Sequence, residues 1–253
     1  DRVAHHALVR RLEPVFERVL LPSVFACRPN KGVHGAVAYA QRQMRRFAWV
    51  MHLDIAHYFA AIRHTVLQHQ LRRRFRGDGL QLVDAVIYSF ARQEGRGLPI
   101  GALTSQHFAN HYLNDADRWV LMQPEITAHC RYMDDYLLWG NSKRDLRRLR
   151  DRFIHYLQNQ LGLQAKIPLI QSCRRGIRFC GIHIKPHTLR PSQRRRRRYR
   201  RAVMRAEQQW RLKQISDQQL QHRYAAARAI LLPADQPAWR RHCLHHAATM
   251  EEV

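Results

Sequence analysis

The sequence predicts an α+β fold in which helices cover one face of an antiparallel sheet. Apolar runs that read as strands occur at residues 49–55 and on both sides of the acidic pair at 134–135. Segments with a helical spacing of apolar residues lie between and after them. The order of strand, helices, strand hairpin, helix and strand resembles a split βαβ layout, which brings the first strand beside the hairpin.

The composition predicts a folded, strongly basic protein. Of the 253 residues, 45% are hydrophobic, which allows a real core and excludes a disordered basic tail. Lys and Arg number 44 against 19 Asp and Glu, a formal net charge of +25. Self-repulsion of this size favours a polyanionic partner, so we expect nucleic acid before an anionic membrane surface. No apolar run is long enough to span a bilayer, and no membrane partner is expected.

The five cysteines are scattered and follow no secretory signal, which favours a reducing, cytoplasmic setting. Cys243 has histidines nearby, but the spacing matches no standard zinc pattern, so a metal site is not expected there. The chain begins at Asp1 without Met and already in a helical pattern, and we therefore expect a fragment or a processed form.

The first elements expected are two helices and a strand. Residues 3–12 have helical spacing, and Pro14 is expected to start a new turn. A basic loop over 25–36 leads into a second helix over 37–47. The strand over 49–55 carries Asp54 near its end.

Further helices and the hairpin follow in the middle of the chain. A helix is expected over 82–90, after a Gly-Asp-Gly break. A glycine-containing loop over 95–106 opens one long helix through 108–120. The apolar segments around 134–135 are expected to form a hairpin with the acids at its tip.

The last elements are a capped helix, two strands and a basic tail. Ser142 is expected to cap a helix that ends at Gly162, and short strands follow near 163–170 and 178–184. Residues 186–253 carry 15 Lys and Arg against 5 Asp and Glu in mostly helix-forming sequence, so a domain boundary is expected near 186.

Three carboxylates are expected to meet, because the layout places Asp54 beside Asp134 and Asp135. Adjacent carboxylates in an apolar setting must be protonated or compensated. Two Mg²⁺ ions are one strong compensation, and at a separation of about 3.5–4 Å they can activate a 3′-hydroxyl and stabilise a leaving pyrophosphate. An exposed acidic turn is the alternative for the adjacent pair alone.

Two further features have a functional and a structural interpretation. Phe59 could press on the sugar of an incoming nucleotide and exclude a 2′-hydroxyl, whereas Tyr58 and Phe59 could equally be core aromatics. The run at 194–201, RRRRRYRR, could bind phosphates, or it could be a solvated helix face.

The segments LDIAHYFAAI (53–62), GLPIGALTSQHFANHYLN (97–114) and YMDD (132–135) resemble the palm motifs of reverse transcriptases, and the similarity extends over nearly the whole chain. The resemblance implies a right-hand polymerase with partial fingers over 1–47, a palm over 48–185 that includes helices at 64–94, and a helical basic thumb over 186–253. It also implies an RNA-directed DNA polymerase, a nucleotidyltransferase that uses an RNA template, a DNA or RNA primer, dNTPs and two Mg²⁺ ions, for which Mn²⁺ can substitute.

The resemblance also assigns site residues. Asp54 and Asp134 correspond to the main metal ligands, Asp135 to a weaker third, and Ile55 is grouped with them. Lys166 corresponds to a lysine that protonates pyrophosphate, with an exposed strand-end lysine as the alternative. The implied nucleotide-binding residues are Arg28, Lys31, Tyr58, Phe59, Ile100, Gly101 and Met133. The implied template- and primer-binding residues are Ser105, Gln106, Gly181, Arg194, Arg195, Arg196, Arg197 and Arg198.

The third motif departs from the usual Gln-Gly and Ser-Pro, because this chain has Ile100-Gly101 and Ser105-Gln106. This pattern resembles reverse transcriptases of diversity-generating retroelements, found in bacteria and their phages. Those enzymes copy a template-repeat RNA with errors at adenines, together with a small basic accessory protein. Loss of an amide beside the nascent pair weakens discrimination between nearly isosteric pairs. The alternatives are another bacterial reverse transcriptase, from a group II intron, a retron or a defence system, and a catalytically silent RNA-binding protein on the same scaffold.

Overall fold

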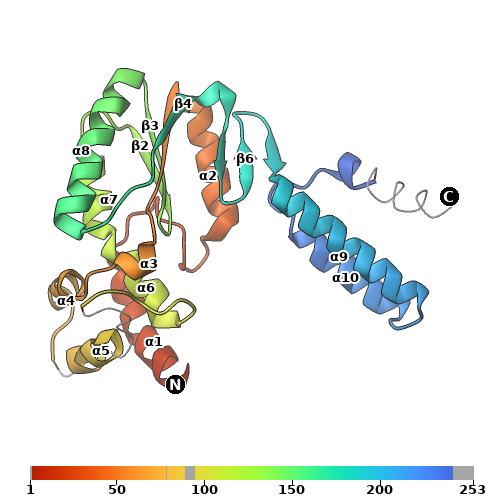
Figure 1. The fold of residues 1–253 in the computed structure, drawn as a ribbon, viewed down its shortest axis with the longest axis horizontal. Coiled ribbons are helices and arrows are strands. Elements are labelled where there is room, and N and C mark those ends of the chain that lie inside the picture. Colours follow the sequence, from red (N-terminus) through yellow and green to blue (C-terminus); the bar gives the residue numbers. More distant parts are fainter. Residues whose placement is uncertain (1, 78, 89–94, 242–253) are drawn as a thin grey trace. The chain divides into compact units, whose positions relative to one another are not determined.

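The computed structural model describes residues 2–77, 79–88 and 95–241 (Figure 1). The chain divides into two compact units, Asp1–Arg175 and Gly176–Val253. None of the helices in the described part has the length and apolar content needed to cross a bilayer. The histidines around Cys243, where a zinc site was considered, lie outside the described residues.

A four-stranded antiparallel sheet, in the order β2-β3-β1-β4, forms the centre of the first unit. Its strands are β1 (Trp49–Asp54), β2 (Ala128–Tyr132), β3 (Asp135–Gly140) and β4 (Leu169–Ser172). The predicted strand and hairpin are therefore confirmed. The register pairs Asp54 with Asp135, so the end of β1 lies beside the tip of the hairpin, as the split βαβ layout predicts.

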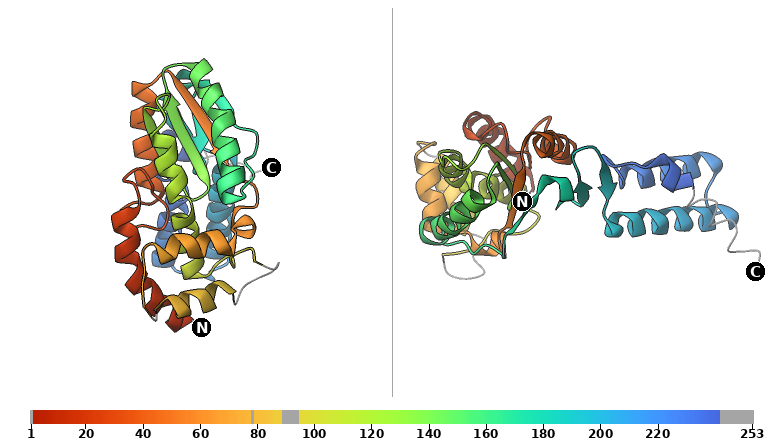
Figure 2. Two further views of the ribbon diagram at one scale, coloured as in Figure 1. Left: turned by 90° about the vertical axis from the view of Figure 1, so that its left-hand side faces the viewer. Right: turned by 90° about the horizontal axis from the view of Figure 1, so that it is seen from above.

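Alternation of side chains along β3 gives the sheet two apolar faces. On one face, Tyr136 packs edge-on against Phe153 of α8 (Lys143–Leu161), with ring centroids 5.4 Å apart. On the other face, Trp139 donates from Nε1 to Met44 Sδ of α2 (Gly32–Arg46) at 3.4 Å. The predicted helical layer is present, and α2 adds a second layer on the opposite face (Figure 2).

The remaining helices of the first unit are α1 (Arg2–Val19), α3 (Tyr58–Ala61), α4 (His64–Arg72), α5 (Gly79–Tyr88), α6 (Leu103–Tyr112) and α7 (Asn114–Leu121). The expected break at Pro14 is wrong, because α1 continues through it. Leu8, Leu12 and Phe16 are buried along this helix. Burial of such side chains stabilises by roughly 1.5–3 kcal/mol each, which outweighs the cost of about 3 kcal/mol for an interior proline.

The long helix expected over 108–120 is two helices, α6 and α7, separated at Leu113 (φ −88°, ψ 0°). Acidic side chains lie in the first turn of α7, where they interact favourably with the helix dipole. The caps of α8 are confirmed: Ser142 Oγ accepts from Asp145 N at 3.2 Å, and Gly162 ends the helix at φ +67°.

Over residues 176–241, the part of the second unit that the structure describes, a small sheet is followed by two long helices. The strands β5 (Ile177–Phe179), β6 (Ile182–Ile184) and β7 (Leu189–Pro191) are antiparallel, so the single strand expected near 178–184 is a hairpin. Helices α9 (Gln193–Arg211) and α10 (Asp217–Ala229) pack on a shared apolar core. The units divide before Gly176, whereas a boundary near 186 was expected. Among the described strands, β5, β6 and β7 pair only with one another, and the chain continues from β7 into α9, so this small sheet belongs with the helices that follow it. Fingers, palm and thumb remain assignments implied by the resemblance.

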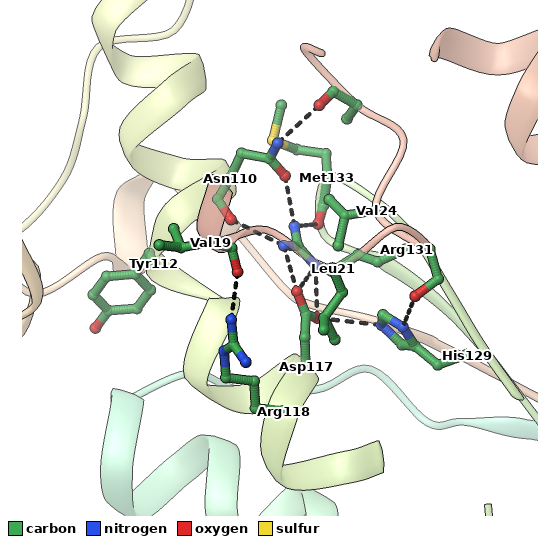
Figure 3. A network of polar contacts seen from close by, with 12 residues as sticks. Val19, Leu21, Val24, Asn110, Tyr112, Asp117, Arg118, His129, Arg131 and Met133 are labelled. Atoms are coloured by element: carbon green, nitrogen blue, oxygen red, sulfur yellow. Dashed lines mark hydrogen bonds and ion pairs between the residues drawn. The ribbon is translucent and has the colours of Figure 1, made fainter. Parts of the chain in front are cut away.

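Arg131 of β2 is a fully buried charge that ties the sheet to two helices (Figure 3). Its Nε donates to Asp117 Oδ1 at 2.8 Å, and its Nη2 donates to Asp117 Oδ2 at 2.7 Å. The same guanidinium donates to the side-chain oxygen of Asn110 at 2.8 Å and to its main-chain oxygen at 2.9 Å. His129 Nε2 lies 3.2 Å from Asp117, whose side chain is also fully buried. The network therefore joins β2, α6 and α7.

Both members of this ion pair stay charged at neutral pH. Burial alone would raise the pKa of Asp117, but Arg131 and His129 outweigh it and lower that pKa to about 2. Burial would lower the pKa of Arg131, but Asp117 raises it above its ordinary value. A carboxyl pKa lower in the folded state than in the unfolded chain contributes stability above the unfolded value. That stability is lost as the pH falls toward the folded value.

We predict that Asp117→Asn lowers the free energy of unfolding at pH 7 by about 3–5 kcal/mol, because Arg131 would lose its buried counter-charge. Asp115→Asn is the control on the same helix, where the carboxylate pairs with the exposed Arg73 and the cost should be at most about 1 kcal/mol. Urea denaturation measures both values. The Asp117→Asn deficit should shrink as the pH falls from about 4 toward 2, and a constant deficit would contradict this assignment.

Candidate active site

The structure brings the three predicted acids to one end of the central sheet. Asp54 is the last residue of β1, Asp135 is the first residue of β3, and the two are register partners. Directly opposed residues have Cβ atoms about 4.5–5.5 Å apart. Asp134 lies in the turn before β3, and its main-chain oxygen accepts from Ile55 N at 3.3 Å. Ile55 therefore links the two chain segments through its backbone, and its side chain is buried.

Two basic side chains contact these acids. Lys166 Nζ lies 2.7 Å from Asp54 Oδ1, and Lys166 N donates to Asp54 O at 2.8 Å. His52, two residues before Asp54 on the same strand, pairs through Nε2 with Asp135 Oδ1. Lys166 was predicted as a site residue, whereas His52 was missed. The signal was available, because side chains two apart on a strand share a face.

The electrostatics of the site favour bound cations. Burial raises the pKa of Asp134, and Asp54 and Asp135 raise it further. Burial also raises the pKa of Asp135, although the hydrogen bond from His52 opposes this. Burial would lower the pKa of His52, but Asp135 and Asp54 reverse the effect and raise it. Bringing these carboxylates together is thus unfavourable without positive charge nearby.

The donor chemistry of the acids fits Mg²⁺, which prefers carboxylate oxygens and leaves room for water and phosphate. Across residues 2–77, 79–88 and 95–241, however, no three His, Cys, Asp or Glu side chains are close enough together to hold a metal ion. Asp54 and Asp135 instead contact Lys166 and His52. The residues therefore fit a metal by chemistry, while their side chains are arranged around basic partners.

Met133 and the loop before α6 carry three of the residues predicted to bind nucleotide: Met133, Ile100 and Gly101. Met133 has a left-handed backbone (φ +57°), and its main-chain oxygen accepts from Arg131 Nη1 at 2.9 Å. Leu98 N donates to Phe59 O at 2.9 Å, which fixes the loop to the segment after β1. In that loop the side chain of Ile100 is 88% exposed, and Gly101 adopts φ +98°.

Two expected contacts find no support, because the side chains are buried. Tyr58 is 3% exposed and its hydroxyl donates to Ala109 O, so its ring is part of the core, which is the alternative that the sequence left open. Ser105 is 1% exposed within α6, and its template contact stays a prediction. Gln106, the next residue, accepts a hydrogen bond from Cys27 Sγ at 3.5 Å, and its template contact remains a prediction.

The expected triphosphate contact of Arg28 stays a prediction that its hydrogen bonds do not support. Its buried guanidinium donates to Glu17 at 2.9 Å and to Leu21 O at 2.6 Å, so its charge is used within the fold. Lys31 donates from Nζ to Pro22 O at 2.7 Å and lies 4.9 Å from the ring centre of Phe25. Its role toward nucleotide remains a prediction.

In the second unit the five consecutive arginines separate into different roles. Arg195 donates to Ile230 O at 3.0 Å and to Leu232 O at 2.8 Å, so its guanidinium is bound within its own unit, and its template contact stays a prediction. Arg196 bonds to Gln236 Oε1 at 3.1 Å and lies 5.1 Å from the ring centre of Trp239. The remaining three share a surface groove with two neighbours; the groove residues are Gln193, Arg194, Arg197, Arg198 and Arg201.

Gly181, expected at the primer, has a structural reason to be glycine. It adopts φ +73° in the β5–β6 turn, and a Cβ there would lie 2.7 Å from Arg195 Nε. A side chain at this position would therefore disturb both the turn and Arg195.

The chain is similar to known proteins in sequence and in fold. The family model described as reverse transcriptase (RNA-dependent DNA polymerase) matches residues 1–184. Protein YkfC of Escherichia coli (strain K12) is 24% identical over 159 residues, which cover 56% of this chain and 40% of that protein.

Two telomerase structures share the fold. Telomerase from Candida tropicalis, in complex with a TWJ fragment of telomeric RNA, aligns with a TM-score of 0.58 and 10% identity over 90% of this chain and 45% of that chain. Telomerase from Candida albicans, also with a TWJ fragment, aligns with a TM-score of 0.50 and 11% identity over 76% and 37%. The chain thus spans less than half the length of these relatives.

The fold similarity confirms the predicted right-hand polymerase class. The family match covers most of the chain, including β1, the β2–β3 hairpin and the acids that they carry. This protein therefore belongs to the reverse transcriptase (RNA-dependent DNA polymerase) family.

Proposed function

We propose that this protein synthesises DNA on an RNA template by nucleotidyl transfer at Asp54, Asp134 and Asp135. The observation that carries the proposal is the pairing of Asp54 with Asp135 at the end of the sheet, within the residues that match the family. Its substrates would be an RNA template, a DNA or RNA primer and dNTPs.

Asp54 and Asp134 would be the main ligands of two Mg²⁺ ions, for which Mn²⁺ could substitute, with Asp135 as a third. When bound, the ions would supply Lewis-acid activation of the primer hydroxyl and charge stabilisation at the leaving pyrophosphate. Lys166 would be the proton donor, because its side chain is exposed to solvent beside Asp54 and its ammonium group is positively charged. His52 would hold the carboxylate of Asp135 in place.

We predict that Asp134→Asn lowers the rate of primer extension on poly(rA)/oligo(dT) with Mg²⁺ by about 100-fold or more, because a neutral amide is a poor ligand and metal catalysis contributes several kcal/mol. Asp151→Asn is the matched control, since that carboxylate lies on the surface of α8 beside Arg150. It should retain the wild-type rate. Wild-type activity in Asp134→Asn would refute the proposed site.

We further propose that the synthesis is error-prone copying of a template-repeat RNA in a diversity-generating retroelement, encoded by a bacterium or phage, with a small basic accessory protein in the cytoplasm. The supporting feature is Ile100, whose apolar side chain is 88% exposed beside Gly101. An isoleucine presented to solvent cannot form the hydrogen bonds that a glutamine amide would make to a nascent pair. A group II intron, retron or defence reverse transcriptase remains the alternative.

Ile100→Gln is expected to reduce misincorporation opposite template adenines by roughly 10-fold, the discrimination that one added polar contact of about 1–2 kcal/mol provides. Sequencing of primer-extension products measures the error spectrum. Met122→Gln, at the exposed C-terminal end of α7, is the control and should leave the errors unchanged. An unaltered adenine error rate in Ile100→Gln would break the link to this type.

We also propose that α9 contacts the phosphate backbone of the template–primer. Arg194, Arg197, Arg198 and Arg201 follow helical spacing and line one groove. The first turn of α9 has no acidic residue, although its N-terminus carries the positive end of the helix dipole. Repulsion among these cations destabilises the free helix, and a polyanion would offset it.

The slope of log Kobs against log salt is negative for binding to phosphates. Replacing these four groove arginines by Gln should make that slope less negative by about 3, at roughly 0.7–0.9 per phosphate contact. Fluorescence anisotropy with a labelled RNA–DNA duplex measures the slope. Arg195→Gln is the control, and it should reduce Tm without changing the slope, because Arg195 bonds to the backbone of its own unit. Equal slopes for the four-arginine variant and the wild type would end this assignment.

A further inference from the structure

Arg131 connects the acid-bearing turn to the interior of the first unit. Its Nη1 donates both to Met133 O in the turn, at 2.9 Å, and to Asn110 Oδ1 on α6, at 2.8 Å. The Arg131 side chain is fully buried, so water does not compete for its hydrogen bonds. One guanidinium therefore contacts both the turn and the core.

We propose that Arg131 is a positioning residue, which fixes the Met133–Asp134 turn and so sets the affinity of the acids for divalent metal. The inference rests on the proposed function, in which Asp134 binds the metal. Arg131 itself contacts neither substrate nor metal in this scheme, and it acts through the backbone.

The conformation of the turn needs such support. Met133 has φ +57°, a left-handed conformation that costs a non-glycine residue about 1–2 kcal/mol. A hydrogen bond to a charged donor contributes about 1.5–3 kcal/mol, which is enough to offset that cost. The carbonyl of Met133 belongs to the planar peptide that continues into Asp134 N, so fixing this oxygen also fixes the start of Asp134.

The other hydrogen bonds of the Arg131 guanidinium are made in the core. Asp117 on α7 accepts from Nε and Nη2 of Arg131, and Asn110 Nδ2 donates to Ala26 O at 2.8 Å. A planar guanidinium can donate to Asp117, Asn110 and Met133 O together, whereas a lysine ammonium cannot reach all of them. On its far side the turn is held by Ile55 N, which donates to Asp134 O at 3.3 Å. Arg131 thus supports the turn from the core.

Arg131→Lys tests the proposal, because it keeps the charge and loses the fork. Mn²⁺ binding to the full chain, followed by electron paramagnetic resonance without nucleic acid or nucleotide, should weaken 10- to 100-fold, as is typical when a group that orients a ligand is removed. Amide hydrogen exchange over residues 132–136 should accelerate. Asn110→Ala is the second variant, to be used if Arg131→Lys does not fold. It removes the hydrogen bonds of the Asn110 side chain and keeps the Arg131–Asp117 pair, and it should weaken Mn²⁺ binding several-fold.

Leu149→Ala separates this role from a general loss of stability. Leu149 is fully buried on α8, and its truncation should cost about 2–5 kcal/mol without touching Arg131. At a temperature where circular dichroism shows every variant folded, Leu149→Ala should bind Mn²⁺ as the wild type does. The proposal would be overturned if Leu149→Ala weakened Mn²⁺ binding as much as Arg131→Lys does. It would also be overturned if Arg131→Lys had the Mn²⁺ affinity and the amide exchange of the wild type.

The outcomes also separate this inference from the proposed function. If the wild type makes DNA while Arg131→Lys binds Mn²⁺ normally, the positioning role fails and the function stands. If the wild type binds Mn²⁺ through Asp134, as shown by loss in Asp134→Asn, but makes no DNA, the function fails. In that case, weaker binding in Arg131→Lys would still support the positioning role.

Discussion

The buried ion pair between Arg131 and Asp117 is the interaction on which the rest of the site depends. Desolvation of two charges costs several kcal/mol per ion, and their attraction offsets it only where the remaining donors are also satisfied. Here Asn110 and Met133 O accept the remaining guanidinium protons. The ion pair is therefore stable only when nearly all of the guanidinium donors have acceptors, and one of those acceptors, Met133 O, lies in the turn. The same interaction thus stabilises the core and sets the backbone from which Asp134 extends.

The two basic contacts in the site differ in how readily a metal could replace them. Lys166 is 60% exposed, so its ion pair with Asp54 lies in a high dielectric and is weak. His52 and Asp135 are each 24% exposed, and water screens their pair less. Asp54 is therefore the easier carboxylate to release toward a cation, in line with the proposal that Asp54 is a main metal ligand and Asp135 a third.

Local patterns in the sequence predicted the strand at 49–55, the hairpin and the capped helix at 142–162, because their signals lie within a few residues. The continuous helix through Pro14 could not be predicted this way, since packing against distant residues decides it. The hydrogen bonds of Arg28 and Arg195 could not be predicted for the same reason. Arg28 donates to Leu21 O and Arg195 to Ile230 O, and local sequence does not show that these acceptors are near. Charge alone does not reveal whether an arginine faces a ligand or its own fold.

The arginine run in α9 shows how helical geometry separates identical side chains. Successive residues of an α-helix are rotated by about 100°, so five arginines in a row cannot share one face. Arg195 points to the backbone of its own unit, Arg196 lies over Trp239, and Arg194, Arg197 and Arg198 share a groove. A count of basic residues therefore overstates the number of phosphate contacts. In the proposed contact, the electrostatic part of the affinity for nucleic acid would therefore depend on the groove arginines, while Arg195 holds α9 against its own unit.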